Sequence, residues 1–497
     1  EIKMKSLGNY TFWFVVGSQD LYGEEVLKTV DAHTKEMVEG WNQDALLPCE
    51  IIWKPVVRNR KEIYDVMCAA NMDEHCAGVI TWMHTFSPSK MWIKGFEALQ
   101  KPLLHINTQF NRDIPWNEID MDFMNLNQSA HGDREHGFIT ARMRLAHKVI
   151  SGYWKDETMR QRMGKWMRAA VGAYESNRVK VMRISDNMRD VAVTEGDKVE
   201  AEIKLGWIVD HYGVGDIIQY VQAVSEEEID EQMKAYEALY DIATENIEAI
   251  RYQAREEIAI EKFMQEHGGY NAFHTNFQDL QQLEQLPGLA AQDLMRKGYG
   301  FAGEGDWKTA ALCRIMKMMT KDKDGGTAFM EDYTYHFDPA CGMNMGAHML
   351  EVCPSVAATR PEIKVVPLGI GDRKDPARLT FKAKEGPAVL ATIIDMGDRF
   401  RMIVNDVICQ KQKHDMPNLP VAGVLWKPLP SLETSAEAWI YAGGAHHSVI
   451  SYDLDADILR DFAEIMNMEF IHICKETKIP DLRKELTWND MIWKLKG

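Results

Sequence analysis

Short apolar strands alternate with amphipathic helices over the first hundred residues of the chain. Strand-like runs of apolar, β-branched and aromatic residues occupy 11–16, 51–57, 77–83 and 103–106, and helical spacing occupies 24–41, 61–72 and 87–99. Buried strands that alternate with helices predict a parallel, doubly wound sheet, which binds ligands at the carboxyl ends of its strands. The loop 17–23 follows the first strand, so it is a candidate binding loop, although a capped turn is an equally good interpretation.

The pattern changes twice further along the chain. Segment 128–175 is helical and strongly charged, and a strand over 178–184 starts a second α/β series. After Gly325 and Gly326, short strands separated by Gly, Pro and Asp turns dominate. A chain of 497 residues also exceeds a single core, since cores stop growing at roughly 250–300 residues. We therefore predict three domains: a Rossmann-like α/β domain at 1–175, a second α/β domain at 176–326 and a mostly antiparallel β domain at 327–497.

Helix boundaries follow from capping residues and breaks in the pattern. We expect Ser87 to cap the helix over 87–99, with Pro88 in its first turn. Helical spacing continues over about 225–267, and we expect a closing helix that starts from Asp457 as its cap.

Composition limits the possible partners. The chain has 57 Lys and Arg against 75 Asp and Glu, a net charge of −18, which argues against nucleic acid because phosphate backbones are bound by basic residues. No apolar run approaches the ~20 residues that a transmembrane helix needs. Eight scattered cysteines without a C-x-x-C motif indicate a reducing compartment, so we expect a cytoplasmic protein without a membrane partner.

The segment 298–303 spells the dinucleotide motif G-x-G-x-x-G. That motif must follow a strand and open a helix, whereas the segment 290–297 before it has helical spacing. A nicotinamide-dependent oxidoreductase is therefore the weakest of the functions that we consider.

Four glycine-bounded segments carry groups that bind metals: 303–308, 330–333, 346–352 and 442–448. Glu304 has glycine on both sides, and neighbouring His446 and His447 should point to opposite faces of an extended chain, so that one of them faces a site. Two Glu and two His form an oxygen and nitrogen set that suits an ion such as Mn²⁺ better than a structural zinc. Taken singly, Glu331 also fits a strand-edge charge and His348 a core histidine.

Eight motifs together resemble the L-arabinose isomerase family over nearly the whole chain. They are GSQDLYG at 17–23, NQSAHGDREHGF at 127–138, DNMRDVAVTEGDKVEAEIKLGW at 186–207, GYGFAGEGDWKTAAL at 298–312, GTAFMEDYTYHF at 326–337, GAHMLEVCPS at 346–355, DPARLTF at 375–381 and GGAHHSV at 443–449. The resemblance implies a metal-dependent aldose–ketose isomerase that converts L-arabinose to L-ribulose through a cis-enediol, with D-galactose to D-tagatose as a slower side reaction.

The resemblance also implies site residues and an assembly. One Mn²⁺ per subunit would be held by Glu304, Glu331, His348 and His447, with Glu304 moving protons at carbon and Glu331 at oxygen. The sugar pocket would be lined by Gln19, Leu21, Tyr22, His131, Met188, Phe277, Tyr333, Ile370 and His446. The family forms hexamers with active sites shared between subunits, and His131 would reach in from a neighbour.

The chain departs from the family pattern at three places. Asp133 and His136 stand where the pattern has glycine and an aromatic residue, 274–276 replaces a threonine-rich run, and the loop 338–345 differs. Two further functions stay open: an isomerase of another aldose such as L-fucose, and a sugar-binding protein without catalysis. The second would need neither a pair of acid–base carboxylates nor a metal.

Overall fold

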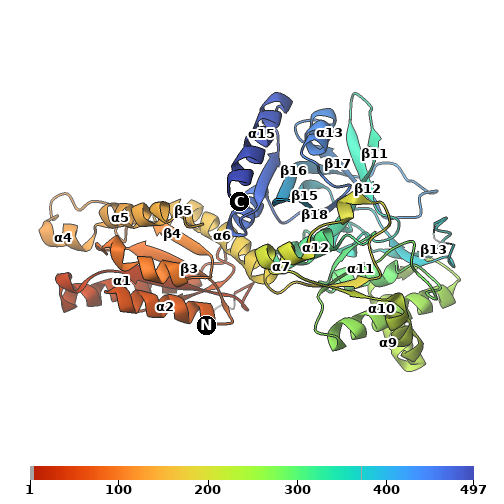
Figure 1. Cartoon of the computed structure of the whole chain (residues 1–497), viewed down its shortest axis with the longest axis horizontal. Helices are drawn as coiled ribbons and strands as arrows, with labels where there is room; N and C mark the ends of the chain where they lie inside the picture. Colours follow the sequence, from red (N-terminus) through yellow and green to blue (C-terminus); the bar gives the residue numbers. More distant parts are fainter. Residues whose placement is uncertain (1–4, 371, 497) are drawn as a thin grey trace. The chain divides into compact units, whose positions relative to one another are not determined.

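A computed structural model describes residues 5–370 and 372–496, and the chain divides into two units after Tyr174 (Figure 1). The division into three domains at 175 and 326 stays a prediction. Among the described residues, none of the helices has both the length and the apolar character needed to cross a lipid bilayer.

The first unit contains the predicted parallel, doubly wound sheet. Its strand order is β2-β1-β3-β4-β5 and every pairing is parallel. The strands are β1 (Thr11–Gly17), β2 (Glu50–Trp53), β3 (Cys76–Met83), β4 (Leu103–Asn107) and β5 (Lys148–Ser151). The helices are α1 (Glu24–Asn42), α2 (Arg60–Met72), α3 (Ile93–Ala98), α4 (Met121–Leu126), α5 (Ser129–Arg142) and α6 (Glu157–Ser176).

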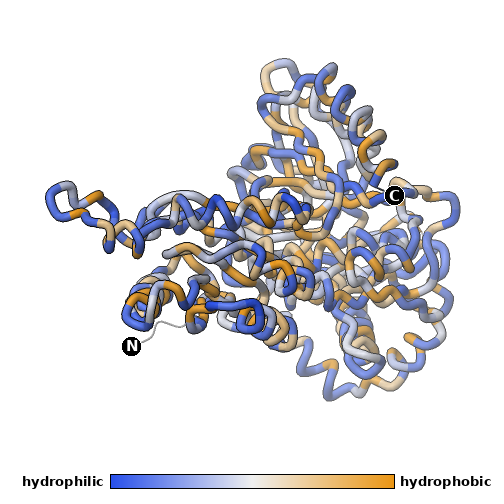
Figure 2. Tube along the Cα trace, turned by 60° about the vertical axis from the view of Figure 1, so that its left-hand side comes forward, coloured by the Kyte–Doolittle hydropathy of each residue, from blue (hydrophilic) through white to orange (hydrophobic). Residues whose placement is uncertain are grey.

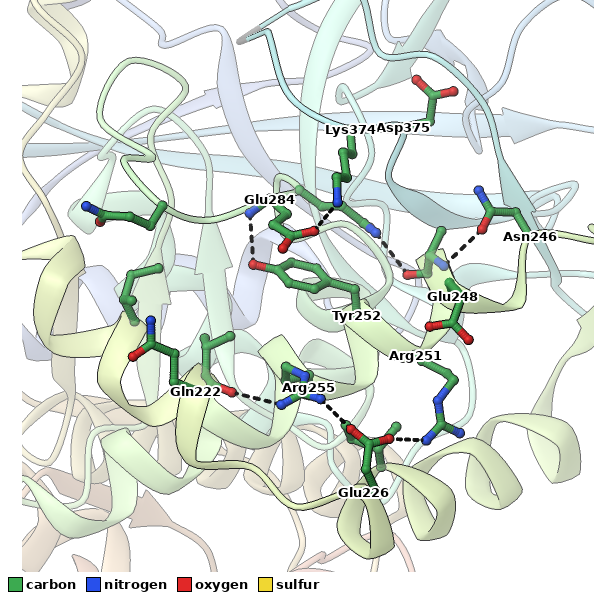
Figure 3. Close-up of a pocket in the computed structure, with 16 residues that line it drawn as sticks. Gln222, Glu226, Asn246, Glu248, Arg251, Tyr252, Arg255, Glu284, Lys374 and Asp375 are labelled. Atoms are coloured by element: carbon green, nitrogen blue, oxygen red, sulfur yellow. Dashed lines mark hydrogen bonds and ion pairs between the residues drawn. The ribbon is translucent and has the colours of Figure 1, made fainter.

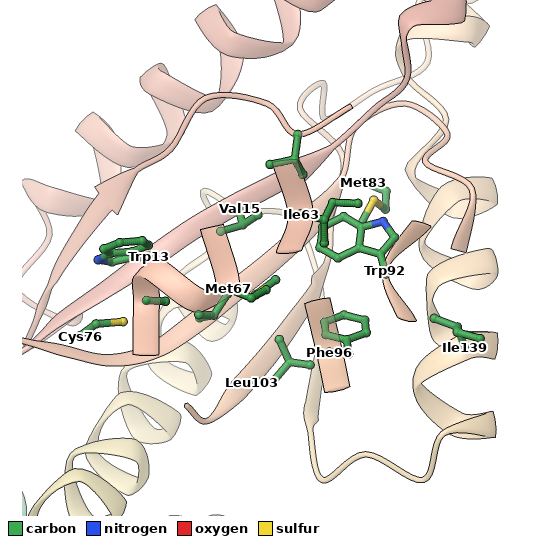
Figure 4. Close-up of a cluster of buried hydrophobic side chains, with 13 residues drawn as sticks. Trp13, Val15, Ile63, Met67, Cys76, Met83, Trp92, Phe96, Leu103 and Ile139 are labelled. Atoms are coloured by element: carbon green, nitrogen blue, oxygen red, sulfur yellow. The ribbon is translucent and has the colours of Figure 1, made fainter. Parts of the chain in front are cut away.

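Helices cover both faces of this sheet. Successive side chains of β1 point to opposite faces and nearly all are apolar, so each face needs a layer of helices to bury it. Phe14 packs edge-on against Trp41 of α1, and Phe12 packs against Trp166 of α6. On the other face, Trp13 and Val15 join a buried cluster with α2, α3 and α5 (Figure 4). Apolar burial on both faces explains why the strands are nearly continuous hydrophobic runs.

The second unit begins with a four-stranded parallel sheet in the order β10-β9-β6-β7. Its strands are β6 (Lys180–Ile184), β7 (Ile208–Tyr212), β9 (Ala272–His274) and β10 (Gly300–Ala302). The helices of this part are α7 (Lys198–Leu205), α8 (Val214–Ala223), α9 (Glu226–Leu239), α10 (Ile247–Glu266), α11 (Leu289–Arg296) and α12 (Trp307–Met319). A small sheet, β14-β13-β8, consists of β8 (Asp241–Ile242), β13 (Glu362–Val365) and β14 (Ala377–Thr380).

The C-terminal part of the second unit is mostly antiparallel, as predicted. Its strand order is β15-β18-β11-β12-β17-β16-β19, and a further β15–β16 pairing closes six of these strands into a ring. The strands are β11 (Thr327–His336), β12 (Met343–Ala347), β15 (Gly386–Asp395), β16 (Phe400–Gln410), β17 (Val424–Pro428), β18 (His447–Ser451) and β19 (Glu469–Ile473). The helices are α13 (Leu432–Tyr441), α14 (Ala456–Ile465) and α15 (Ile479–Lys496). Along the helices of both units, apolar and polar residues alternate, as expected for helices with one buried face (Figure 2).

Several predicted helix boundaries are wrong. The Ser87 hydroxyl accepts a hydrogen bond from Trp92 Nε1 at 2.9 Å instead of capping a helix, and α3 starts only at Ile93. The cap of α14 is Asp455, which accepts from the Ile458 amide at 3.0 Å, and not Asp457. The helical pattern over 225–267 is broken by β8, which pairs with β13, a strand more than a hundred residues further along the chain. In the same way, α14 does not close the chain, since β19 and α15 follow it.

Candidate metal and catalytic site

Glu304 lies just beyond the carboxyl end of β10, in the turn that leads into α12. Its φ of +58° is a left-handed conformation that residues other than glycine rarely adopt, and such conformations cluster at functional sites. Main-chain hydrogen bonds fix the turn: the Met188 amide donates to the Glu304 carbonyl at 3.0 Å, and the Gly305 amide donates to the Thr275 carbonyl at 3.1 Å. The Glu304 carboxylate is thereby held at the edge of the parallel sheet.

Glu331 and His447 face each other across two paired strands. They are directly opposite in the antiparallel ladder of β11 and β18, so their side chains share one face of the sheet. His348 follows β12, and its Nε2 lies 3.6 Å from Glu331 Oε2. A Cβ on Gly303 would lie 2.5 Å from the His348 ring, so only glycine fits beside this histidine.

Both histidines of the pair beside Glu304 approach its carboxylate. His446 Nε2 and His447 Nε2 each lie 2.8 Å from Glu304 Oε2. An extended chain would point the two side chains to opposite faces, but β18 starts at His447 and His446 lies in the preceding turn, so both can approach the carboxylate.

Buried carboxylates hold the far ring nitrogens of the two buried histidines. His447 Nδ1 lies 2.9 Å from Asp306 Oδ2, and His348 Nδ1 hydrogen-bonds Glu351 Oε2. Asp306 also caps α12 by accepting a hydrogen bond from the Thr309 amide. The start of α12 therefore holds the Asp306 carboxylate in place, and this carboxylate in turn orients the His447 ring. Both Nε2 atoms consequently face the cluster, the arrangement by which carboxylates orient metal-binding histidines.

An aspartate at the start of a helix, as at Asp306, predicts an ordinary cap, and no motif marks Glu351 as a supporting residue. Glu351 stands three residues after His348 in the mostly apolar segment 346–352, which is the one signal that could have marked it. The position of Asp306 does not indicate its partner, because the hydrogen bond that Asp306 Oδ2 accepts from His447 Nδ1 joins residues 141 positions apart.

The carboxylates and imidazoles shift one another's pKa values. Burial opposes charge on His447, but the hydrogen bond to Asp306 and the nearby Glu304 carboxylate raise its pKa to about 9. Burial likewise opposes ionisation of Glu304 and Asp306, yet the histidines lower the pKa of Glu304 and bring the pKa of Asp306 to about 2. For Glu331 burial prevails, and its pKa is raised.

The donor set fits a divalent cation. Two groups of three residues, Glu304 with His446 and His447, and Glu331 with His348 and His447, each offer ligand atoms within 4.8 Å of one another. Within the described residues, His447 Nε2 is buried without a hydrogen bond, although it lies near Glu304. A mixed set of carboxylate oxygens and imidazole nitrogens suits Mn²⁺ and similar ions. The four predicted metal ligands thus fall in two groups that share His447, with His446 in the first group.

Three predicted sugar-pocket residues of the second unit lie around this cluster. The Phe277 ring is 5.9 Å from the His348 ring, between centroids. Met188 contacts the Glu304 main chain, and the Tyr333 hydroxyl points to Met349 Sδ at 3.8 Å. These residues add apolar and hydroxyl groups beside the carboxylates.

Three predicted residues of the first unit are linked through Gln128 and Phe86. Gln128 Nε2 donates to the Tyr22 hydroxyl at 3.0 Å, and its Oε1 lies 2.8 Å from His131 Nδ1. Phe86 stacks on His131 with ring centroids 4.7 Å apart, and its carbonyl accepts from Gln19 at 3.3 Å. The loop after β1 and the start of α5 therefore form one polar surface in this unit.

The other two predicted pocket residues are apolar and exposed. Leu21, in the short helix that follows β1, is 82% exposed, and Ile370, between β13 and β14, is 41% exposed. Neither is enclosed within its own unit.

A cavity of about 870 Å³ lies elsewhere in the second unit, beside α8, α9 and α10 (Figure 3). Several of its charged groups form ion pairs: Arg251 and Arg255 bind Glu226, and Lys374 binds Glu284. None of the predicted site residues lines this cavity, and its paired charges do not form a metal or acid–base centre.

Comparison with known proteins gives matches in order along the chain. Family models described as the L-arabinose isomerase N-terminal, central and C-terminal domains match residues 6–178, 180–322 and 326–469. The L-arabinose isomerases of Geobacillus stearothermophilus and Geobacillus kaustophilus are 57% and 56% identical over 497 residues, which cover 99% of this chain and 100% of each relative. The L-arabinose isomerase of Bacillus subtilis is 53% identical over 494 residues, 98% of this chain and 99% of the relative. The chain therefore belongs to the L-arabinose isomerase family, whose members are enzymes.

Proposed function

We propose that the chain converts L-arabinose to L-ribulose, and D-galactose to D-tagatose more slowly. The observation that carries this proposal is the convergence of Glu304, Glu331, His348 and His447 from four separate segments, in a chain of this family. The names of the relatives support L-arabinose over L-fucose as the substrate.

The four converging side chains would hold one Mn²⁺ ion. When bound, such an ion polarises the oxygens on C1 and C2 of the open-chain sugar and stabilises negative charge that develops on them, an effect worth several kcal/mol. The protein's own contribution is orientation, since Asp306 and Glu351 turn both histidines toward the cluster.

The two carboxylates would divide the proton transfers. Glu304 takes the proton from C2 while Glu331, in its protonated form, gives its proton to O1, which gives a cis-enediol. Glu331 then removes the proton from O2, and Glu304 returns its proton to C1. Every atom is conserved, so no oxidant or reductant is needed. A positioned carboxylate typically contributes on the order of 10²–10⁴-fold to each such step.

A panel of aldoses tests the substrate. The purified protein with Mn²⁺ is incubated separately with L-arabinose, D-galactose and L-fucose, and ketose formation is measured. We expect the highest kcat/KM with L-arabinose and a lower value with D-galactose. Faster turnover of L-fucose would overturn the substrate assignment, and saturable sugar binding without any ketose would favour a non-catalytic protein.

We further propose a cytoplasmic hexamer whose active sites are shared between subunits. The proposed pocket residues fall in both units, and the exposed apolar Leu21 fits a residue covered on assembly. Mixing tests this: His131→Ala and Glu304→Gln chains, each impaired alone, should regain activity when they are co-expressed and assemble together. No recovery in mixed hexamers, verified by mass, would place all site residues on one chain.

A further inference from the structure

A second group of metal-binding side chains lies at the tip of the β11–β12 hairpin, which projects from its sheet (Figure 1). His336 is the last residue of β11 and pairs with Met343, the first residue of β12. The connecting loop brings Cys341 back to His336, and Cys341 Sγ lies 3.5 Å from His336 Nε2.

Asp338 completes the group through a tight turn. Its Oδ1 accepts from the Ala340 amide at 2.9 Å, and its carbonyl accepts from the Cys341 amide at 3.0 Å. These bonds fix Asp338 and Cys341 relative to each other. His336, Asp338 and Cys341 each offer a ligand atom within 4.8 Å of the other two.

The chemistry of this group differs from that of the Glu and His cluster. It combines a thiol, an imidazole and a carboxylate, and thiolate ligands select zinc and similar ions, whereas carboxylates select Mn²⁺. His336 and Asp338 are exposed and Cys341 is partly exposed, so an ion can reach them and water can take the fourth position.

We propose that the hairpin tip binds one zinc-like divalent cation through Cys341 Sγ, His336 and Asp338. Binding releases the thiol proton to solvent, so the affinity rises with pH. Glu331 lies five positions before His336 on β11, and none of the three ligands belongs to the proposed catalytic cluster. The site is therefore a second metal site that is independent of the isomerase reaction.

Absorption of bound Co²⁺ separates the two sites. A thiolate on Co²⁺ gives a near-ultraviolet charge-transfer band that oxygen and nitrogen ligands do not give. We expect the Mn²⁺-loaded protein to develop this band with one Co²⁺ per chain and to lose it when Zn²⁺ is added. Cys341→Ser should abolish the band. It should also weaken Zn²⁺ binding at the hairpin by at least ~10-fold, because the loss of a residue that only supports a ligand already costs that much, and Cys341 would be a ligand itself.

Cys474→Ser is the matched control, because Cys474 is also partly exposed and contacts a carboxylate, Glu476 Oε2, at 3.2 Å. This variant should keep the band. In the unmodified chain, Zn²⁺ should protect Cys341 but not Cys474 from alkylation, as mapped by mass spectrometry. A band that persists in Cys341→Ser, or equal alkylation of Cys341 with and without Zn²⁺, would overturn the proposal.

Discussion

Buried histidines occur in both units, but their surroundings differ. In the second unit, a buried carboxylate holds Nδ1 of His348 and of His447, and the pKa of each imidazole is raised. In the first unit, His84 and His136 pack against the rings of Trp82 and Trp92, and neither Nδ1 has a partner among the described residues. Burial there lowers the pKa of His136 and brings that of His84 to about 3.

The comparison teaches that a histidine that is buried without a carboxylate partner serves only in packing. A carboxylate bound to one ring nitrogen instead fixes the ring so that the other nitrogen points into the site. A third case in the first unit limits this rule. His105 Nε2 lies 2.8 Å from buried Asp133, but that carboxylate also accepts from Asn107 and from the Met83 amide. Asp133 therefore ties α5 to the sheet. A site needs several carboxylates that converge on the aimed nitrogens, as Glu304 and Glu331 do.

Metal removal should produce the largest effect, because the ion is held by the carboxylates and histidines of the second unit and stabilises the charge that develops on the sugar oxygens. We expect no ketose formation after chelation and recovery on addition of Mn²⁺, as measured with L-arabinose. Hydrogen exchange in β1–β4 of the first unit should stay unchanged by the same treatment. Full activity in chelator, with no metal detected by elemental analysis, would reject a metal role.

Neutralising either converging carboxylate should come next. Glu304→Gln and Glu331→Gln should each lower kcat by at least ~10²-fold, since each removes a proton carrier while keeping the side-chain shape. Circular dichroism should show an unchanged fold. Glu437→Gln, at an exposed position of α13, is the control and should keep kcat within about twofold, as for surface changes in general. An active Glu304→Gln enzyme would refute its assigned role.

Asp306→Asn tests whether the aiming carboxylate matters. We expect a loss of roughly 10–100-fold in Mn²⁺ affinity or activity, because the His447 ring loses its orienting partner. Asparagine still caps a helix, so α12 should keep its start. Asp197→Asn, at the cap of α7, controls for capping and should change neither quantity. If the two variants had equal Mn²⁺ affinity and equal activity, Asp306 would not act by orienting His447.

Acidification should affect the packing histidines of the first unit, by a smaller amount. The unfolded chain protonates His84 and His136 below pH ~6.5, whereas the folded chain keeps them neutral. Unfolding then binds protons, so the free energy of unfolding falls from pH ~6.5 toward pH 3, by at most about 1.4 kcal/mol per pH unit and group. Hydrogen exchange of β3 at pH 7 and pH 5 measures this change. His136→Phe should flatten the dependence, and an unchanged slope would contradict the interpretation.

The strand–helix alternation was enough to predict the parallel sheet of the first unit. Local patterns carry that information, because the strands are buried on both faces and the helices on one. Local patterns failed where a side chain or a distant strand competes with the predicted helix. Ser87 bonds the indole of Trp92, five residues further on, instead of capping a helix, and β8 exists because β13 pairs with it.

The metal ligands could be named from the resemblance, but their supports could not. Glu304 and Glu331 stand in recognisable motifs, whereas the residues that aim the histidines act through tertiary contacts. The close approach of Gly303 to His348 depends on the packing of β10 against the end of β12, which no spacing in the sequence reveals.

Anomalous diffraction from crystals of the Mn²⁺-loaded protein tests the central claim most directly. We predict one manganese peak per chain, coordinated jointly by Glu304, Glu331, His348 and His447. A fully occupied peak that lacks these four side chains, in an enzyme that still forms L-ribulose, would contradict the account.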